Sequence, residues 1–132
     1  MKANKIAYPL LALMLVTVSI CTLDAKEKYS IKPIPIPDGL SSQGVQSSII
    51  NAAIGRRWNI VSKKDNQIVI NLTHRGYDST LTFKIEKAQI KVSSDSWTTN
   101  KKGEKKKRKE PIGWIENIRR DIVVFMNREL YQ

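Results

Sequence analysis

A run of cations at residues 101–109 is the part of this sequence with the most distinctive chemistry. Seven cations and one anion, Glu104, give the run a net charge of +6. The cations are Lys101, Lys102, Lys105, Lys106, Lys107, Arg108 and Lys109. Because like charges repel one another and bury no apolar surface, we predict a mobile loop here.

Trp97 lies just before this run, in the polar segment 94–100, which we also expect to be a loop. An indole beside cations can stack on sugars or bases, or insert at a membrane interface. It can also simply cover the edge of a core. We therefore take Trp97 and the seven cations as a candidate anion-binding site. Its alternatives are a nucleic-acid contact and a solubilising loop without a partner.

His74 is the only histidine, and its ordinary titration range lies near neutral pH. A general base needs an orienting partner, and a predicted turn separates His74 from Asp78, the nearest acid in the sequence. The other acids are scattered, without metal-ligand or paired-carboxylate spacing, and no glycine-rich phosphate loop or serine elbow occurs. The sequence predicts no catalytic residue, no metal and no cofactor, and gives His74 a surface or packing role.

The N-terminus has the pattern of a secretory signal. Two lysines precede residues 6–23, which carry no charge and are slightly shorter than the roughly 20 apolar residues of a membrane span. We predict a cleaved signal peptide at 1–25, with Ala25 before the cut, and a periplasmic or secreted protein. The alternative is a membrane-anchored lipoprotein with its lipid on Cys21, although the bulky Ile20 is a poor residue before that cysteine.

The whole chain has 132 residues, with 23 basic and 12 acidic side chains and a net charge of +11. One cysteine and one histidine exclude a disulfide framework and a zinc cluster. An apolar content of 41% indicates a folded domain, and the length allows only one. Export argues against nucleic acid as the physiological partner of so basic a chain.

Residues 26–40 are expected to form a proline-rich linker, since three prolines at alternate positions forbid a helix and favour an extended chain. This linker is either a spacer or partner ligand, or a lead-in that docks Ile34 and Ile36 on the domain edge. Residues 41–132 form the domain. A helix is predicted from Ser41 or Ser42 to Gly55, and a second one from about Pro111.

Between the helices, apolar and polar residues alternate in four short segments joined by brief turns, which is typical of an antiparallel meander. The predicted fold is therefore α+β: a two-layer sandwich with a four-stranded antiparallel meander and two helices packed on one face, in the order α-β-β-β-β-α.

This pattern resembles a family of small proteobacterial periplasmic proteins and lipoproteins of unknown function. The resemblance covers about residues 33–126 and implies an envelope location, and a lipid-modified cysteine is usual in that family. It provides no reaction. The residues that carry it are Pro35-Ile36-Pro37-Asp38-Gly39-Leu40-Ser41, Arg57-Trp58, Leu72 with Arg75, Ser94-Asp95-Ser96, and Trp114-Ile115-Glu116-Asn117-Ile118.

Together these patterns predict an exported, non-catalytic accessory or binding protein of the cell envelope. Its basic run would contact an anionic envelope lipid or polymer, or an acidic envelope protein. Two alternatives remain: a protein-interaction module that uses a sheet edge or the proline-rich lead, and an uncharacterised enzyme.

Overall fold

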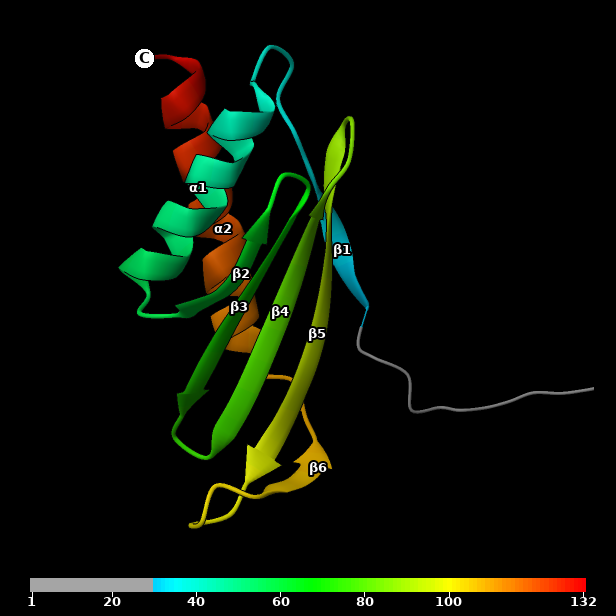
Figure 1. Ribbon diagram of the computed structural model, residues 1–132, viewed down its shortest axis with the longest axis vertical. Helices are drawn as coiled ribbons and strands as arrows, with labels where there is room; N and C mark the ends of the chain where they lie inside the picture. The colour runs from blue at the N-terminus through cyan, green and yellow to red at the C-terminus, as the bar shows by residue number, and fades with distance from the viewer. Residues whose placement is uncertain (1–29) are drawn as a thin grey trace, which may run out of the picture.

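The computed structural model describes residues 30–132 (Figure 1). The predicted signal peptide 1–25, including Cys21, lies outside the described residues. The elements run in the order β1 (Ser30–Pro35), α1 (Ser42–Gly55), β2 (Asn59–Lys64), β3 (Gln67–His74), β4 (Tyr77–Ile85), β5 (Gln89–Thr99), β6 (Lys105–Arg108) and α2 (Ile112–Leu130).

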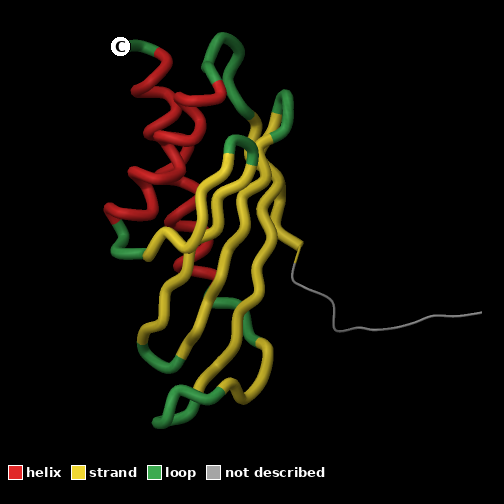
Figure 2. Tube along the Cα trace, in the orientation of Figure 1, coloured by secondary structure: helices red, strands yellow, loops and turns green. Residues whose placement is uncertain are grey.

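The strands form one antiparallel sheet in the order β1-β5-β4-β3-β2, and β6 pairs with the far end of β5. Strands β2 to β5 are the predicted meander. Both helices cover one face of the sheet, and no helix within residues 30–132 lies on the opposite face (Figures 1 and 2). The predicted α+β two-layer sandwich is confirmed, with two strands more than expected.

Strand β1 lies within the segment expected to be a linker. Ile31 and Ile34 are 6% and 1% exposed and join the core, while a bulge separates their pairings with β5. Prolines are tolerated here because β1 is an edge strand, where a missing N–H removes no bond within the sheet. Burial of two isoleucines therefore brings residues 30–35 into the domain.

Strand β6 lies within the run expected to be a mobile loop, and β5 extends through the segment around Trp97 that was also expected to be a loop. Trp97 pairs with Arg108 and Thr99 with Lys105. Repulsion acts between side chains, whereas the sheet is held by backbone groups, so a highly charged segment can still pair while its side chains remain in solvent.

The core lies between the sheet and the helices. The buried stripe of α2, formed by Ile115, Ile118, Ile122 and Met126, belongs to one apolar cluster with the sheet residues Ile68, Ile70, Leu81, Phe83, Ile90 and Val92. Helix α1 begins as predicted, since the backbone N–H of Gly44 donates to Ser41 Oγ at 3.0 Å. No helix within residues 30–132 is long and apolar enough to cross a membrane.

Candidate functional site

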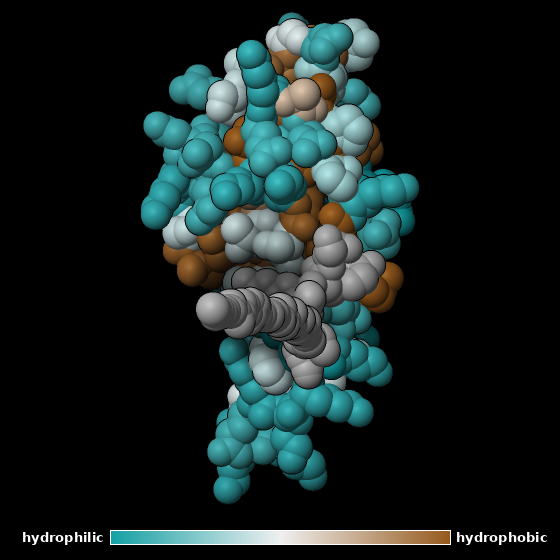
Figure 3. Space-filling view, turned by 90° about the vertical axis from the view of Figure 1, so that its right-hand side faces the viewer, coloured by the Kyte–Doolittle hydropathy of each residue, from teal (hydrophilic) through white to brown (hydrophobic). Residues whose placement is uncertain are grey.

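The residues from Trp97 to Lys109, here called the basic hairpin, form one end of the molecule. The sheet extends beyond the helices at this end (Figure 1), and Figure 3 shows it as a hydrophilic lobe. Asn100 organises its turn: Asn100 Oδ1 accepts from the backbone N–H groups of Lys102 and Glu104, both at 2.9 Å, and Asn100 Nδ2 donates to Glu104 Oε1 at 2.7 Å. The turn is thus a hydrogen-bonded structure.

Trp97, Lys105 and Arg108 are the predicted site residues that the fold brings together. The Arg108 guanidinium carbon lies 5.2 Å and the Lys105 Nζ 5.6 Å from the indole ring centre, which are cation–π distances. The alternation of buried residues along β5 directs Asp95 and Trp97 to the sheet face without helices. The indole is therefore half-buried beneath cations, and does not cover the core.

Asp95 completes this cluster, although the sequence patterns did not place it in the candidate anion-binding site. Asp95 Oδ1 accepts from Trp97 Nε1 at 2.9 Å and from Arg108 Nη1 at 3.0 Å. Burial by itself would raise the pKa of Asp95, but these two hydrogen bonds and the charges of Arg108 and Lys105 lower it below the ordinary value. The spacing of Asp95 and Trp97, two apart on a strand, is the sequence signal that both side chains share a face.

The remaining lysines of the run point to solvent and are not brought together. All six lysines between 101 and 109 are exposed, and none forms an ion pair with any residue from 30 to 132. The one acid inside the run, Glu104, is bound by Asn100. The charge of these six lysines is thus left unpaired within the described structure.

A buried chain of serines fixes the connection from β6 to α2. Ser79 Oγ lies 2.7 Å from Ser96 Oγ, which lies 2.7 Å from Ser94 Oγ, and Ser94 Oγ donates to Glu110 Oε1 at 2.5 Å. All three serines are buried on the helix side of the sheet. Because a carboxylate only accepts, the hydroxyls must all donate in one direction, towards Glu110.

An aromatic cluster surrounds Trp114 in the first turn of α2. The ring centre of Trp114 lies 5.4 Å from that of Tyr77, 6.0 Å from that of His74 and 6.5 Å from that of Trp58. Trp58 is buried, whereas Trp114 is half-buried. We call Trp114, Tyr77 and His74 the aromatic shelf.

A shallow hollow lies on each side of the shelf. One of about 450 Å³ is lined by Arg75, Tyr77, Glu110 and Trp114, together with residues 111–113. The other, of about 270 Å³, is lined by Trp58, Leu72, His74, Trp114, Asn117 and Arg56. Arg56 is already engaged, because its Nε donates to Asp121 Oδ2 at 2.7 Å, and this contact raises the pKa of Arg56.

Two arginines adopt backbone conformations that favour glycine or asparagine. Arg57 (φ 65°) follows the C-terminus of α1, and Arg75 (φ 48°) forms with Gly76 (φ 79°) the two-residue turn between β3 and β4. For an ordinary side chain the left-handed region costs roughly 1–2 kcal/mol. Glycine or asparagine would be more stable at either position, so backbone preference does not explain the two arginines.

His74 lies at the end of β3, as predicted, with its exposed ring against Trp114. Within residues 30–132, no acidic side chain forms a hydrogen bond or ion pair with His74, and no group of three or more His, Cys, Asp and Glu could hold a metal ion. The contact that the structure shows for His74 is with the ring of Trp114.

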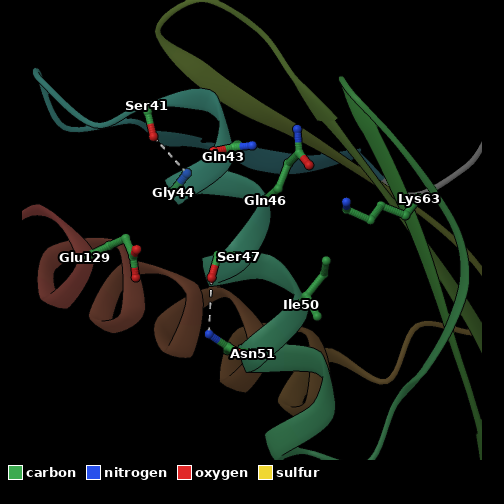
Figure 4. Close-up of a pocket in the computed structure, with 9 residues that line it drawn as sticks. All are labelled: Ser41, Gln43, Gly44, Gln46, Ser47, Ile50, Asn51, Lys63 and Glu129. Atoms are coloured by element: carbon green, nitrogen blue, oxygen red, sulfur yellow. Dashed lines mark hydrogen bonds between the residues drawn. The ribbon is translucent and has the colours of Figure 1, made fainter.

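A further groove, of about 490 Å³, lies along the outer side of α1 (Figure 4). Four of its polar side chains already serve the fold: Ser41 caps the helix, Gln46 Nε2 donates to the backbone oxygen of Asp65 at 2.8 Å, and Asn51 Nδ2 donates to Ser47 Oγ at 3.4 Å. We therefore assign no ligand to this groove.

No family model matches the chain, and no curated protein or solved structure is significantly similar to it. The resemblance to small proteobacterial envelope proteins remains a prediction.

Proposed function

We propose that this chain is an exported, non-catalytic binding protein of the cell envelope, and that the basic hairpin attaches it to an anionic envelope partner. The observation that carries the proposal is the ordered but uncompensated charge of the hairpin. Six exposed lysines there form no ion pair with any described residue, whereas hydrogen bonds hold the strand and the turn in place.

The order of the hairpin supports binding over mere solubility. A solubilising loop needs no fixed geometry, but here Asp95 holds Arg108 and Trp97 at hydrogen-bond distance. A preorganised array of cations loses less conformational entropy when it meets a partner. Such an array binds by electrostatic attraction, which salt screens over about 10 Å at 0.1 M ionic strength.

Binding to two anionic probes tests the proposal: phosphatidylglycerol vesicles and poly-glutamate. We expect the purified protein to bind both, and more weakly as salt rises. A variant with Lys102, Lys106 and Lys107 changed to Gln should lose most of this binding, because these side chains are exposed and carry the charge.

The matched control changes Lys63, Lys64 and Lys84 to Gln. It removes the same charge from exposed positions outside the hairpin. Equal weakening by both variants would show that net charge alone matters, and would reject the hairpin as the binding element.

Export is tested by the intact mass of the native protein in soluble and membrane fractions. A soluble species that begins at Lys26 agrees with the predicted cut after Ala25. A membrane species that begins at an acylated Cys21 supports the lipoprotein alternative. A chain that retains residues 1–25 without acylation would contradict both.

A protein-interaction module remains a second candidate, and β2 is the edge that favours it. Val61 on β2 and Ile54 near the end of α1 are large apolar side chains, and both are 60% exposed. At the other edge, Pro33 and Pro35 interrupt β1. Crosslinking in intact cells from a photoreactive residue at position 61 would capture one stoichiometric partner if this candidate is correct.

A further inference from the structure

The hollow beside Tyr77 and Trp114 lies at the foot of the basic hairpin. Tyr77 pairs with Thr98, and the backbone N–H of Thr99 donates to Gly76 O at 2.8 Å, so the β3–β4 turn borders the start of the hairpin. On the other side, Glu110 directly follows the last lysine of the run. The hollow therefore borders the base of the hairpin.

The walls of this hollow combine two half-buried aromatic rings with one donor and one acceptor of opposite charge. Trp114 and Tyr77 provide the rings, Arg75 the donor and Glu110 the acceptor. Neither Arg75 nor Glu110 forms an ion pair with a residue in the described part of the chain. The serine chain holds only Oε1 of Glu110, and through it fixes this wall of the hollow.

This combination suits a sugar ring. The apolar face of such a ring packs on an aromatic side chain, and its hydroxyls donate to a carboxylate and accept from a guanidinium. A bare anion such as a phosphate would instead be repelled by Glu110. Anionic groups on the same ligand would therefore meet Arg75 and the lysines of the hairpin.

We propose that the hollow and the basic hairpin together bind an acidic glycan, a chain of sugar rings that carry carboxylate groups. This inference rests on the proposed function and names the chemistry of its partner: the hollow takes a sugar ring, and the hairpin takes the acid groups of neighbouring rings. The left-handed backbone of Arg75 is consistent with this role, because asparagine would stabilise the turn better but would not contribute a cation.

Three probes separate the contribution of the sugar rings to binding from that of the carboxylate groups. Oligogalacturonate carries rings and carboxylates, its methyl ester carries rings without charge, and poly-glutamate carries carboxylates without rings. We expect the purified protein to bind oligogalacturonate about tenfold more tightly than poly-glutamate, as for one added stacked ring. It should also bind oligogalacturonate more tightly than the methyl ester, which lacks the charge that the lysines attract. Equal affinity for oligogalacturonate and poly-glutamate would overturn the proposal.

Two variants test whether the sugar ring binds in the hollow. Trp114→Ala should weaken oligogalacturonate binding about tenfold and leave poly-glutamate binding unchanged. Because Trp114 also packs on Trp58, Arg75→Asn is the second variant: its turn should form at least as well, yet glycan binding should fall. Glycan binding that is unchanged in Arg75→Asn would overturn the proposal.

Binding by the lysine variant and by the two variants of the hollow separates loss of the sugar site from loss of the hairpin as the anion-binding element. If the Lys102, Lys106 and Lys107 variant loses poly-glutamate binding but Trp114→Ala and Arg75→Asn both keep glycan affinity, the hairpin binds anions without a sugar site. If that lysine variant binds every probe normally, the proposed function itself fails. The protein could instead bind single-stranded polyuridylate more tightly than oligogalacturonate and lose this binding in Trp114→Ala. That result would assign the aromatic shelf to a nucleobase and overturn the proposal of a glycan ligand.

Discussion

The Nη1 atom of Arg108 lies 3.0 Å from Oδ1 of Asp95, and this ion pair joins β6 to β5 on the sheet face that carries no helix. Trp97 donates to the same oxygen. A single carboxylate thus orients both the indole and the guanidinium at the base of the basic hairpin. Without the Asp95 carboxylate, only a few backbone hydrogen bonds would hold β6 on β5 while the lysines of the hairpin repel one another.

We therefore predict that the hairpin contact weakens in acid. The pKa of Asp95 is lower in the folded protein than in the unfolded chain, so its carboxylate contributes stability above the unfolded value of about 3.9. That contribution is lost as pH falls through the lower folded pKa. The NMR shift of the Trp97 Nε1–H should titrate in this acidic range. In Asp95→Asn the titration should be absent, and a titration retained in that variant would contradict this assignment.

The left-handed arginines should be sites at which substitution stabilises the protein. We expect Arg57→Gly to raise the free energy of unfolding by roughly 1 kcal/mol, because glycine adopts a positive φ without steric cost at the position after a helix. Urea denaturation measures the change. Arg56→Gly is the matched control: its φ of −105° gives glycine no advantage, and it loses the contact with Asp121, so it should destabilise. A less stable Arg57→Gly would reject the argument.

Removing the central hydroxyl of the serine chain should destabilise the domain. Ser96→Ala leaves the buried Ser79 hydroxyl without its partner, at a cost of about 1–3 kcal/mol in the free energy of unfolding. Because Ser94 keeps its bond to Glu110, the further change Ser79→Ala should cost little more. A double-mutant cycle of Ser79 and Ser96 should therefore show strong coupling, and additive effects would refute the chain.

Residues 30–35 should contribute to stability as part of the domain. Ile34→Ala, at a side chain 1% exposed, is expected to cost about 2–5 kcal/mol of unfolding free energy. Lys32→Ala on the same strand is exposed and should change it by less than about 0.5 kcal/mol. Chemical denaturation of both variants is the measurement. An unaffected Ile34→Ala protein would mean that β1 is dispensable, as the linker interpretation predicted.

The sequence by itself determined the α+β class, both helices and the central meander. These follow from local signals: the cap at Ser41, the apolar stripe from Ile115 to Met126, and strict alternation along β3 and β4. Each signal reports the face that an element must bury, and a chain of this length has only one core in which to bury it.

The tertiary structure decided the two additional strands and the composition of the candidate site. The prolines of residues 30–35 and the charge repulsion in residues 105–108 both predicted segments without strand structure. The sequence does not show that β5 offers backbone hydrogen-bond partners to both segments along its outer edge. Likewise, Trp114 is far along the chain from Arg75 and Tyr77, and it meets them only because the meander places the β3–β4 turn beside the first turn of α2. Local residue patterns specify what each segment buries, but only the packed sheet specifies which exposed side chains become neighbours.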